Sequence, residues 1–178
     1  MKEAVIVSTA RTPIGKAYRG AFNNTEGPAL AGHAIKNAVA KAGIDPGEVD
    51  DVILGCALQQ GTTGNNTARQ SLLAAGLPVS VSGMTLDRQC SSGMMAIATA
   101  AKQVIDDGMP ICIGGGVESI SLVQNDKMNL YANKSATSHA KDIYMAMLNT
   151  AEVVAERYSI KREDMDAYGL QSQMRTAA

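Results

Sequence analysis

The sequence is poor in aromatic residues and has almost no net charge. It contains no Trp, one Phe and five Tyr, and its 16 Lys and Arg are balanced by 17 Asp and Glu, which leaves a formal net charge of −1. Nucleic-acid-binding proteins normally present a basic face and aromatic rings for base stacking, so we expect no nucleic-acid partner. Hydrophobic residues make up 46% of the chain, and this fraction argues against disorder. We therefore expect a soluble globular protein with a core of small and aliphatic side chains.

Long apolar runs and paired cysteines are also missing. No apolar stretch approaches the roughly 20 residues that cross a bilayer, and no positively charged leader precedes the apolar residues that begin at Ala4. Cys56, Cys90 and Cys112 are an odd number of widely spaced cysteines without a CxxC pair or a Cys/His cluster. This pattern excludes a secreted disulfide framework and offers no metal-ligand set. We therefore expect a cytoplasmic protein with no bound metal and no membrane association.

Apolar periodicity predicts alternating strands and helices. Pro28 suits the first turn of one predicted helix, and Gly43 suits its C-terminal cap. This alternation predicts an α/β fold in which helices pack on a mixed, mainly parallel sheet. Strands are predicted over 4–9, 51–58, 83–87 and 110–113, helices over 27–42, 67–75 and 92–106, and a tight glycine turn over 114–116.

The composition changes near residue 120. The segment 124–139 is polar and has little periodicity, and two helical patterns follow over 150–158 and 162–176. We therefore expect two domains, 1–120 and 121–178.

Cys90 is the most informative cysteine. It lies between a predicted strand and the predicted helix 92–106, whose faces are nearly all apolar, so this helix is expected to lie in the protein interior. At a helix N-terminus, unpaired N–H groups and the helix dipole favour a thiolate, which makes the sulfur nucleophilic. The position alone leaves two readings, a nucleophile or a cysteine that only fills space. Cys56 and Cys112 lie within apolar strand patterns, where the second reading is favoured.

The residues around Cys90 resemble the nucleophilic-cysteine motif of the thiolases, the acyl-CoA:acetyl-CoA C-acyltransferases. Other segments resemble the family in the same order and spacing, and together they cover essentially the whole chain. The segments are Asp87-Arg88-Gln89-Cys90-Ser91-Ser92-Gly93-Met94, Ala10-Arg11-Thr12-Pro13-Ile14-Gly15, Val49-Asp50-Asp51-Val52-Ile53-Leu54-Gly55, Asn65-Asn66-Thr67-Ala68-Arg69-Gln70, Gly114-Gly115-Gly116-Val117-Glu118-Ser119 and Thr150-Ala151-Glu152-Val153-Val154-Ala155.

This resemblance implies one half of a thiolase-like layered fold over 1–120 and the beginning of a loop domain, which covers the substrate, over 121–178. It implies that Cys90 takes an acyl group from a 3-ketoacyl-CoA, releases acetyl-CoA and passes the acyl group to a second CoA. The Cys90 N–H is placed to stabilise the thioester oxyanion, and Met147 matches a family position near the acyl pocket. Coenzyme A then enters as a substrate, and no cofactor is expected to be bound. The resemblance also suggests a homodimer or tetramer, with 83–87 and 61–70 near the subunit contacts.

The family also uses a His, a second Cys and an Asn for acid/base chemistry, from motifs that this sequence lacks. His33 is expected on the polar side of a helix and His139 in a polar loop, and neither matches those motifs. The implied partner is therefore a C-terminal half, in the same polypeptide or in a second chain.

Several alternatives stay open. The chain can be an inactive half-length thiolase-like fragment or assembly partner, or part of a biosynthetic acetoacetyl-CoA thiolase. The segment Gln89-Cys90-Ser91-Ser92 favours the degradative 3-ketoacyl-CoA branch of the family. Leu148 lies where the family usually has Gly, and this difference leaves the acyl-chain preference open. A cysteine hydrolase or redox protein is disfavoured, because Cys90 has no plausible His partner and no resolving Cys nearby.

Overall fold

The computed structural model describes residues 3–178 and divides into two units. The first unit ends at Asn129, and the second runs from Leu130 to Ala178. The sequence places its boundary near residue 120, where the short helix α4 (Ile120–Val123) begins. Helix α4 contacts the 3-10 turn η2 (Gly61–Thr63) and buries Val123, so it belongs to the first unit.

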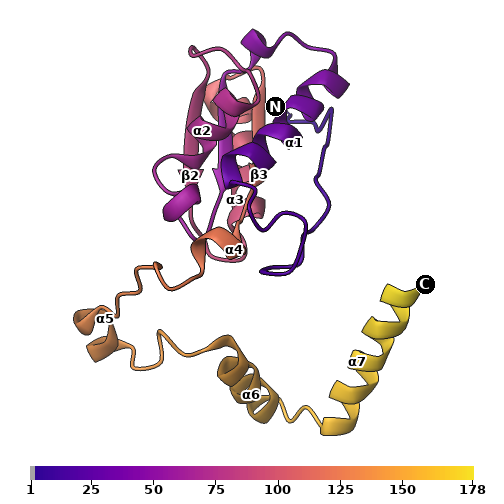
Figure 1. Ribbon diagram of the computed structural model, residues 1–178, viewed down its shortest axis with the longest axis vertical. Coiled ribbons are helices and arrows are strands. Elements are labelled where there is room, and N and C mark those ends of the chain that lie inside the picture. Colours follow the sequence, from indigo (N-terminus) through magenta and orange to yellow (C-terminus); the bar gives the residue numbers. More distant parts are fainter. Residues whose placement is uncertain (1–2) are drawn as a thin grey trace. The chain divides into compact units, whose positions relative to one another are not determined.

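Three parallel strands form the sheet of the first unit (Figure 1). Strand β1 (Asp51–Gly55) lies between β2 (Ser82–Leu86) and β3 (Cys112–Gly116). All five residues of β1 are buried, as expected for the central strand of a parallel sheet with both faces covered. The parallel α/β prediction is therefore confirmed.

Alternate residues of β1 face two different layers. Val52 and Leu54 pack in one apolar cluster with residues of α1 (Gly27–Ala42) and α2 (Thr67–Ala74). Ile53 packs instead with Ala96 and Ala100 of α3 (Ser92–Lys102), and the side chains of a strand alternate between its two faces. The sheet therefore lies between α1 and α2 on one face and α3 on the other.

The ends of these helices follow the local sequence signals. Pro28 occupies the first turn of α1, and Gly43 closes the helix in the left-handed region at φ 68°. The 3-10 turn η1 (Pro46–Glu48) begins with a capping box, in which the side chains of Asp45 and Glu48 each accept a backbone N–H. Helix α3 continues into the π-helical segment η3 (Gln103–Asp107), which Gly108 terminates at φ 75°.

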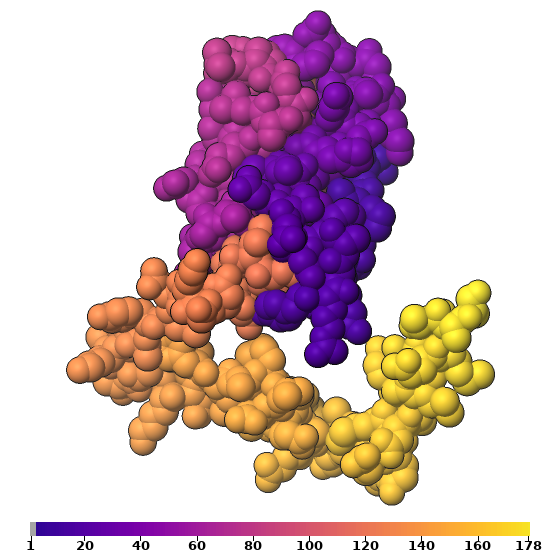
Figure 2. Space-filling view, viewed as in Figure 1, coloured from indigo at the N-terminus to yellow at the C-terminus, as the bar shows by residue number. Residues whose placement is uncertain are grey.

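The predicted strand over 4–9 does not form. Val5, Ile6 and Val7 are 74–77% exposed, and the segment is held beside α1 by hydrogen bonds from Ser8 Oγ to Ala38 O and from Lys41 Nζ to Thr9 O. A strand needs backbone partners as well as β-branched residues, and within residues 3–178 no strand pairs with this segment. The space-filling view shows the indigo N-terminal residues at the surface (Figure 2).

One further prediction in this unit is wrong. Gly114–Gly116 form the last three residues of β3 rather than a tight turn, because they pair with the last three residues of β1. Helix α3 buries Ala96 and Ala100 against the sheet, whereas Met94 is 77% exposed, as expected for this apolar helix in one half of the fold. Within the described residues, the sheet is the layer on which α3 packs, so one face of the helix is covered.

The second unit contains helices α5 (Lys134–His139), α6 (Met147–Arg157) and α7 (Arg162–Ala177). The two predicted helices are thus confirmed, with α6 starting three residues earlier, while α5 adds a short helix within the polar segment. None of the residues in these three helices is buried. An ion pair of 2.9 Å between Arg162 Nε and Asp166 Oδ1 joins successive turns of α7. Across residues 3–178, no helix combines the length and the apolar character that a membrane span requires.

Candidate active site

Cys90 is exposed and lies in the turn that joins β2 to α3. The Ser92 hydroxyl group holds this turn together, because it accepts the Arg88 N–H at 2.8 Å and donates to Gln89 O at 2.6 Å. Asp87 Oδ1 accepts the Gln89 N–H at 2.6 Å, which closes a tight Asx turn. The side chain of a free cysteine is therefore presented to solvent on a hydrogen-bonded turn in front of a helix N-terminus.

Gln89 has a strained backbone directly before the candidate nucleophile. Its φ angle of 48° lies in the left-handed region, which residues other than Gly, Asn and Asp seldom occupy. Such strain persists where surrounding bonds impose it, and it is concentrated at functional sites. Here the Asp87 and Ser92 side chains impose the conformation.

The carboxyl ends of all three strands meet at the edge of the sheet where this turn lies, as in other parallel α/β folds. Strand β1 leads into Cys56 and Ala57, and β3 leads into Val117 and Glu118. Glu118 Oε1 accepts the Ala57 N–H, which ties the two segments together. A carboxylate and two thiols thus follow strands that end at one edge.

Cys56 itself is fully buried behind this edge. Burial, and after it the negative charge of Glu118, raises the pKa of the Cys56 thiol to about 11. A thiol with this pKa is almost entirely protonated at neutral pH and is a poor nucleophile. This supports the packing interpretation of Cys56.

Cys112 lies at the opposite end of the sheet, in the first position of β3. Burial, followed by the charges of Asp51 and Asp50, raises its thiol pKa to about 11. Gln103 Nε2 donates to Asp51 Oδ2 at 2.9 Å, whereas Asp51 Oδ1 and Gln103 Oε1 are buried without a partner. Cys112 is therefore also held as a neutral thiol.

The other residues named from the sequence lie apart from Cys90 in the chain and are exposed. His33 is on the solvent side of α1, as predicted, with its ring Nε2 3.3 Å from Asn37 Nδ2. His139 ends α5, with Nδ1 2.9 Å from Ser135 O. Met147 begins α6 in the second unit and is 72% exposed, and the neighbouring Leu148 is also exposed. The acyl-pocket assignment of Met147 stays a prediction.

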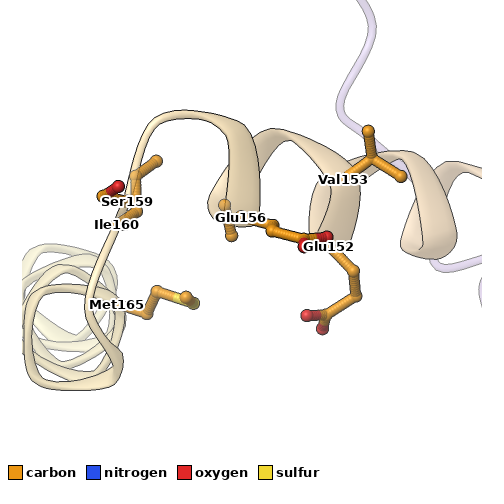
Figure 3. A pocket seen from close by; sticks show the side chains of 7 residues that line it. Glu152, Val153, Glu156, Ser159, Ile160 and Met165 are labelled. Carbon is orange, nitrogen blue, oxygen red and sulfur yellow. The ribbon is translucent and has the colours of Figure 1, made fainter.

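A shallow hollow of about 530 Å³ lies in the second unit between the end of α6 and the start of α7. The close-up shows Glu152 and Glu156 on α6, and Met165 on α7 (Figure 3). Neither Cys90 nor Met147 lines this hollow. In the stretch 3–178, no group of three or more His, Cys, Asp or Glu residues is arranged to hold a metal ion.

Sequence reasoning missed three residues that shape the site: Ser92, Glu118 and Gly55. Gly55 ends β1, and the backbone of Ser92 and Gly93 lies directly against it. The sequence signal for Gly55 was a glycine at the end of each of two neighbouring strands, Gly55 in β1 and Gly116 in β3, because a glycine in a strand often marks the close approach of another backbone. In the sequence, Ser92 and Glu118 were visible only as members of the resembling segments, because their hydrogen bonds form only in the folded turn and sheet.

Known proteins are similar to this chain over almost its whole length. Residues 4–178 match the family described as "Thiolase, N-terminal domain". The 3-ketoacyl-CoA thiolase of Bacillus subtilis (strain 168) is 40% identical over 177 residues, which are 99% of this chain and 45% of that protein. The 3-oxoadipyl-CoA/3-oxo-5,6-dehydrosuberyl-CoA thiolase of Escherichia coli (strain K12) is 37% identical over 99% of this chain and 48% of that protein.

The crystal structure of the Bacillus anthracis acetyl-CoA acetyltransferase has the same fold. It superposes with a TM-score of 0.81 at 37% identity and covers 98% of this chain and 46% of its own. The chain thus spans a little under half the length of the relatives it matches. The resemblance first noted around Cys90 extends through the parallel sheet and into the second unit, and the chain belongs to the thiolase family, whose N-terminal domain it matches.

Proposed function

We propose that a polypeptide containing this chain is a thiolase-type acyltransferase that moves an acyl group between a 3-ketoacyl-CoA and CoA through a thioester on Cys90. The observation that carries this proposal is the exposed Cys90 on a strained, hydrogen-bonded turn in front of α3. The names of the relatives support the reaction class, because they include 3-ketoacyl-CoA thiolases and acetyl-CoA acetyltransferases.

The proposed chemistry has two half-reactions. The Cys90 thiolate attacks the 3-keto carbon of the substrate, a carbon–sulfur bond forms, and the bond between C2 and C3 breaks. The electron pair of that bond passes to C2, which takes up a proton and leaves as acetyl-CoA. The thiolate of a second CoA then attacks the acyl carbonyl carbon and displaces Cys90, which regenerates the nucleophile. The covalent intermediate divides one difficult step into two easier ones.

The turn before α3 contributes to both half-reactions. Each attack places negative charge on a carbonyl oxygen, and N–H groups at a helix N-terminus stabilise such charge. The Cys90 N–H is our candidate donor. The proton of the Cys90 thiol and the proton delivered to C2 need an acid/base group, and we propose that it comes from a C-terminal half in the same polypeptide or a second chain.

Oligomeric state, substrate pocket and location complete the proposal. We propose a homodimer or tetramer in the cytoplasm, with Met147 near the acyl chain and no metal. The biosynthetic direction, condensation of two acetyl-CoA molecules, is a second candidate, favoured by the name of the B. anthracis structure.

Mass spectrometry after mixing with acetoacetyl-CoA tests the proposal. The complete polypeptide is expected to gain one acetyl group on Cys90, and Cys90→Ser is expected to lower thiolysis by at least about 1,000-fold, because a hydroxyl group is a far weaker nucleophile than a thiolate. Unchanged thiolysis in Cys90→Ser would refute the nucleophile. Acetylation of the isolated 178-residue chain would refute the requirement for a second half, whereas an inactive assembly partner gains no acetyl group even with its C-terminal half supplied.

A further inference from the structure

The first turn of α3 lies directly against the end of β1. A Cβ atom built on Gly55 would lie 2.2 Å from the carbonyl carbon of Ser92, 2.3 Å from its oxygen and 2.5 Å from the nitrogen of Gly93. Ordinary contacts of a Cβ atom begin at 3.4 Å. All three neighbours are backbone atoms, so no side-chain rotation relieves the overlap.

The strand cannot retreat from the helix. Gly55 is buried at the end of the central strand, paired with Leu86 of β2 on one side and Gly116 of β3 on the other. Its carbonyl oxygen accepts the Val117 N–H at 3.0 Å, and the next N–H, that of Cys56, donates to Leu86 O at 3.0 Å. Both flanking strands therefore hold the backbone of Gly55 in place.

Any side chain at position 55 must instead move the start of α3. The overlap at the Ser92 carbonyl carbon requires a shift of about 1 Å to reach ordinary contact. Cys90 precedes Ser92 by two residues, and the Ser92 hydroxyl group is bonded to both Arg88 and Gln89 of the same turn. A shift of the first helical turn is therefore transmitted to Cys90.

We propose that Gly55 is a positioning residue for Cys90: the missing Cβ sets how closely the first turn of α3 approaches β1, and so sets where the Cys90 sulfur and N–H meet the substrate carbonyl. This inference rests on the proposed thiolase function and assigns Gly55 no contact with substrate. A misplacement of about 1 Å in a catalytic constellation costs on the order of 100-fold in rate.

Gly55→Ala in the complete polypeptide tests this role, with Gly114→Ala as a matched control. A Cβ at Gly114 would lie 2.8 Å from Ile97 Cα, so it also displaces α3, but seven residues beyond Cys90. We expect Gly55→Ala to slow acylation of Cys90 by acetoacetyl-CoA about 100-fold, with KM for CoA nearly unchanged. Gly114→Ala is expected to slow acylation less than about tenfold and to cost less thermal stability than Gly55→Ala, because its overlap is smaller and distant from the turn. The amount of acyl-enzyme finally formed counts the folded sites, so unfolding alone does not imitate a slower rate.

A milder variant covers the case in which Gly55→Ala does not fold. A Cβ at Gly116 would lie 3.1 Å from Gly55 O and 3.2 Å from Gly93 Cα. Because Gly55 is held by both flanking strands, Gly116→Ala pushes the same turn by a few tenths of an ångström and is expected to slow acylation to a smaller degree. Equal acylation rates in Gly55→Ala and Gly114→Ala, or a wild-type rate in whichever of the Gly55 and Gly116 variants folds, would overturn the proposal. The rate of Cys90 alkylation by iodoacetamide distinguishes failure of the thiolase function from failure of the positioning role of Gly55. If acetoacetyl-CoA never acylates wild-type Cys90, the proposed function fails. Slower alkylation of Cys90 in Gly55→Ala than in the wild type would still support the positioning role.

Discussion

The Ser92 hydroxyl group makes two hydrogen bonds within the turn that carries Cys90, and the loss of both bonds is expected to lower the free energy of unfolding. Ser92 is 3% exposed, and its oxygen accepts the Arg88 N–H and donates to Gln89 O. Ser92→Ala deletes both bonds. Gln89 O keeps a second donor, the Ser92 N–H at 3.0 Å, whereas no other acceptor for the Arg88 N–H is present among the described residues.

Each such hydrogen bond contributes about 0.5–1.5 kcal/mol, and an unsatisfied group costs about 1–3 kcal/mol. Arg88 and Gln89 are themselves exposed, so water replaces part of the loss. We therefore expect Ser92→Ala to lower the free energy of unfolding of the first unit by about 1–2 kcal/mol. With a urea dependence of about 2 kcal/mol per molar, the unfolding midpoint falls by about 0.5–1 M.

Ser91→Ala is the matched control. The Ser91 hydroxyl group donates to Arg88 O at 2.8 Å, but Ser91 is exposed, so water replaces this bond. Its loss is expected to stay within about 0.5 kcal/mol. Urea unfolding followed by circular dichroism measures both variants. Equal midpoints for the two variants would refute the argument that the buried hydroxyl group holds the turn.

Three other predictions concern the remaining thiols and the buried carboxylate of Asp51. At pH 8, iodoacetamide is expected to modify Cys90 and leave Cys56 unmodified. The Cys56 pKa of about 11 in place of 9.0 lowers the thiolate fraction of Cys56 about 100-fold. Peptide mass spectrometry measures both rates, and modification of Cys56 as fast as Cys90 would contradict the burial of Cys56. The pKa values of Cys56 and Cys112 are raised in the folded state, so the thiols of the unfolded chain ionise at lower pH than those of the folded chain. The free energy of unfolding is therefore expected to fall as the pH rises from 9 towards 11. A thermal midpoint that does not change over that pH range would contradict this prediction. Asp51 and Gln103 share one hydrogen bond and each keeps an unpartnered buried oxygen. Asp51→Asn replaces one of these acceptors by a donor for the other, so it is expected to stabilise the fold by about 0.5–1.5 kcal/mol and, by removing a negative charge, to lower the Cys112 pKa towards its ordinary value. Asp51→Ala, which supplies no donor, is the control for that gain.

The sequence by itself determined the elements whose signals are local. Helix α1 has Pro28 in its first turn and Gly43 as its C-terminal cap, because these residues restrict or permit backbone angles regardless of their surroundings. The order of strands and helices indicated a parallel sheet, since such a sheet needs crossover connections. The cysteine in front of α3 and the surrounding motif were also readable, because they occupy one continuous segment.

Only the tertiary structure decided the features that depend on partners distant in the sequence. The apolar segment 4–9 has a strand's composition but, within residues 3–178, no strand beside it, whereas Gly114–Gly116 extend β3 because they pair with the last three residues of β1. The sequence also left open which side of α3 packs on the sheet, since its residues are apolar on nearly every face. The close approach of Ser92 to Gly55, which leaves no room for a Cβ atom at position 55, joins residues 37 apart in the chain and arises only when helix and strand meet. The sequence thus identified Cys90 as the nucleophile candidate, while packing between β1 and α3 decides where its sulfur lies.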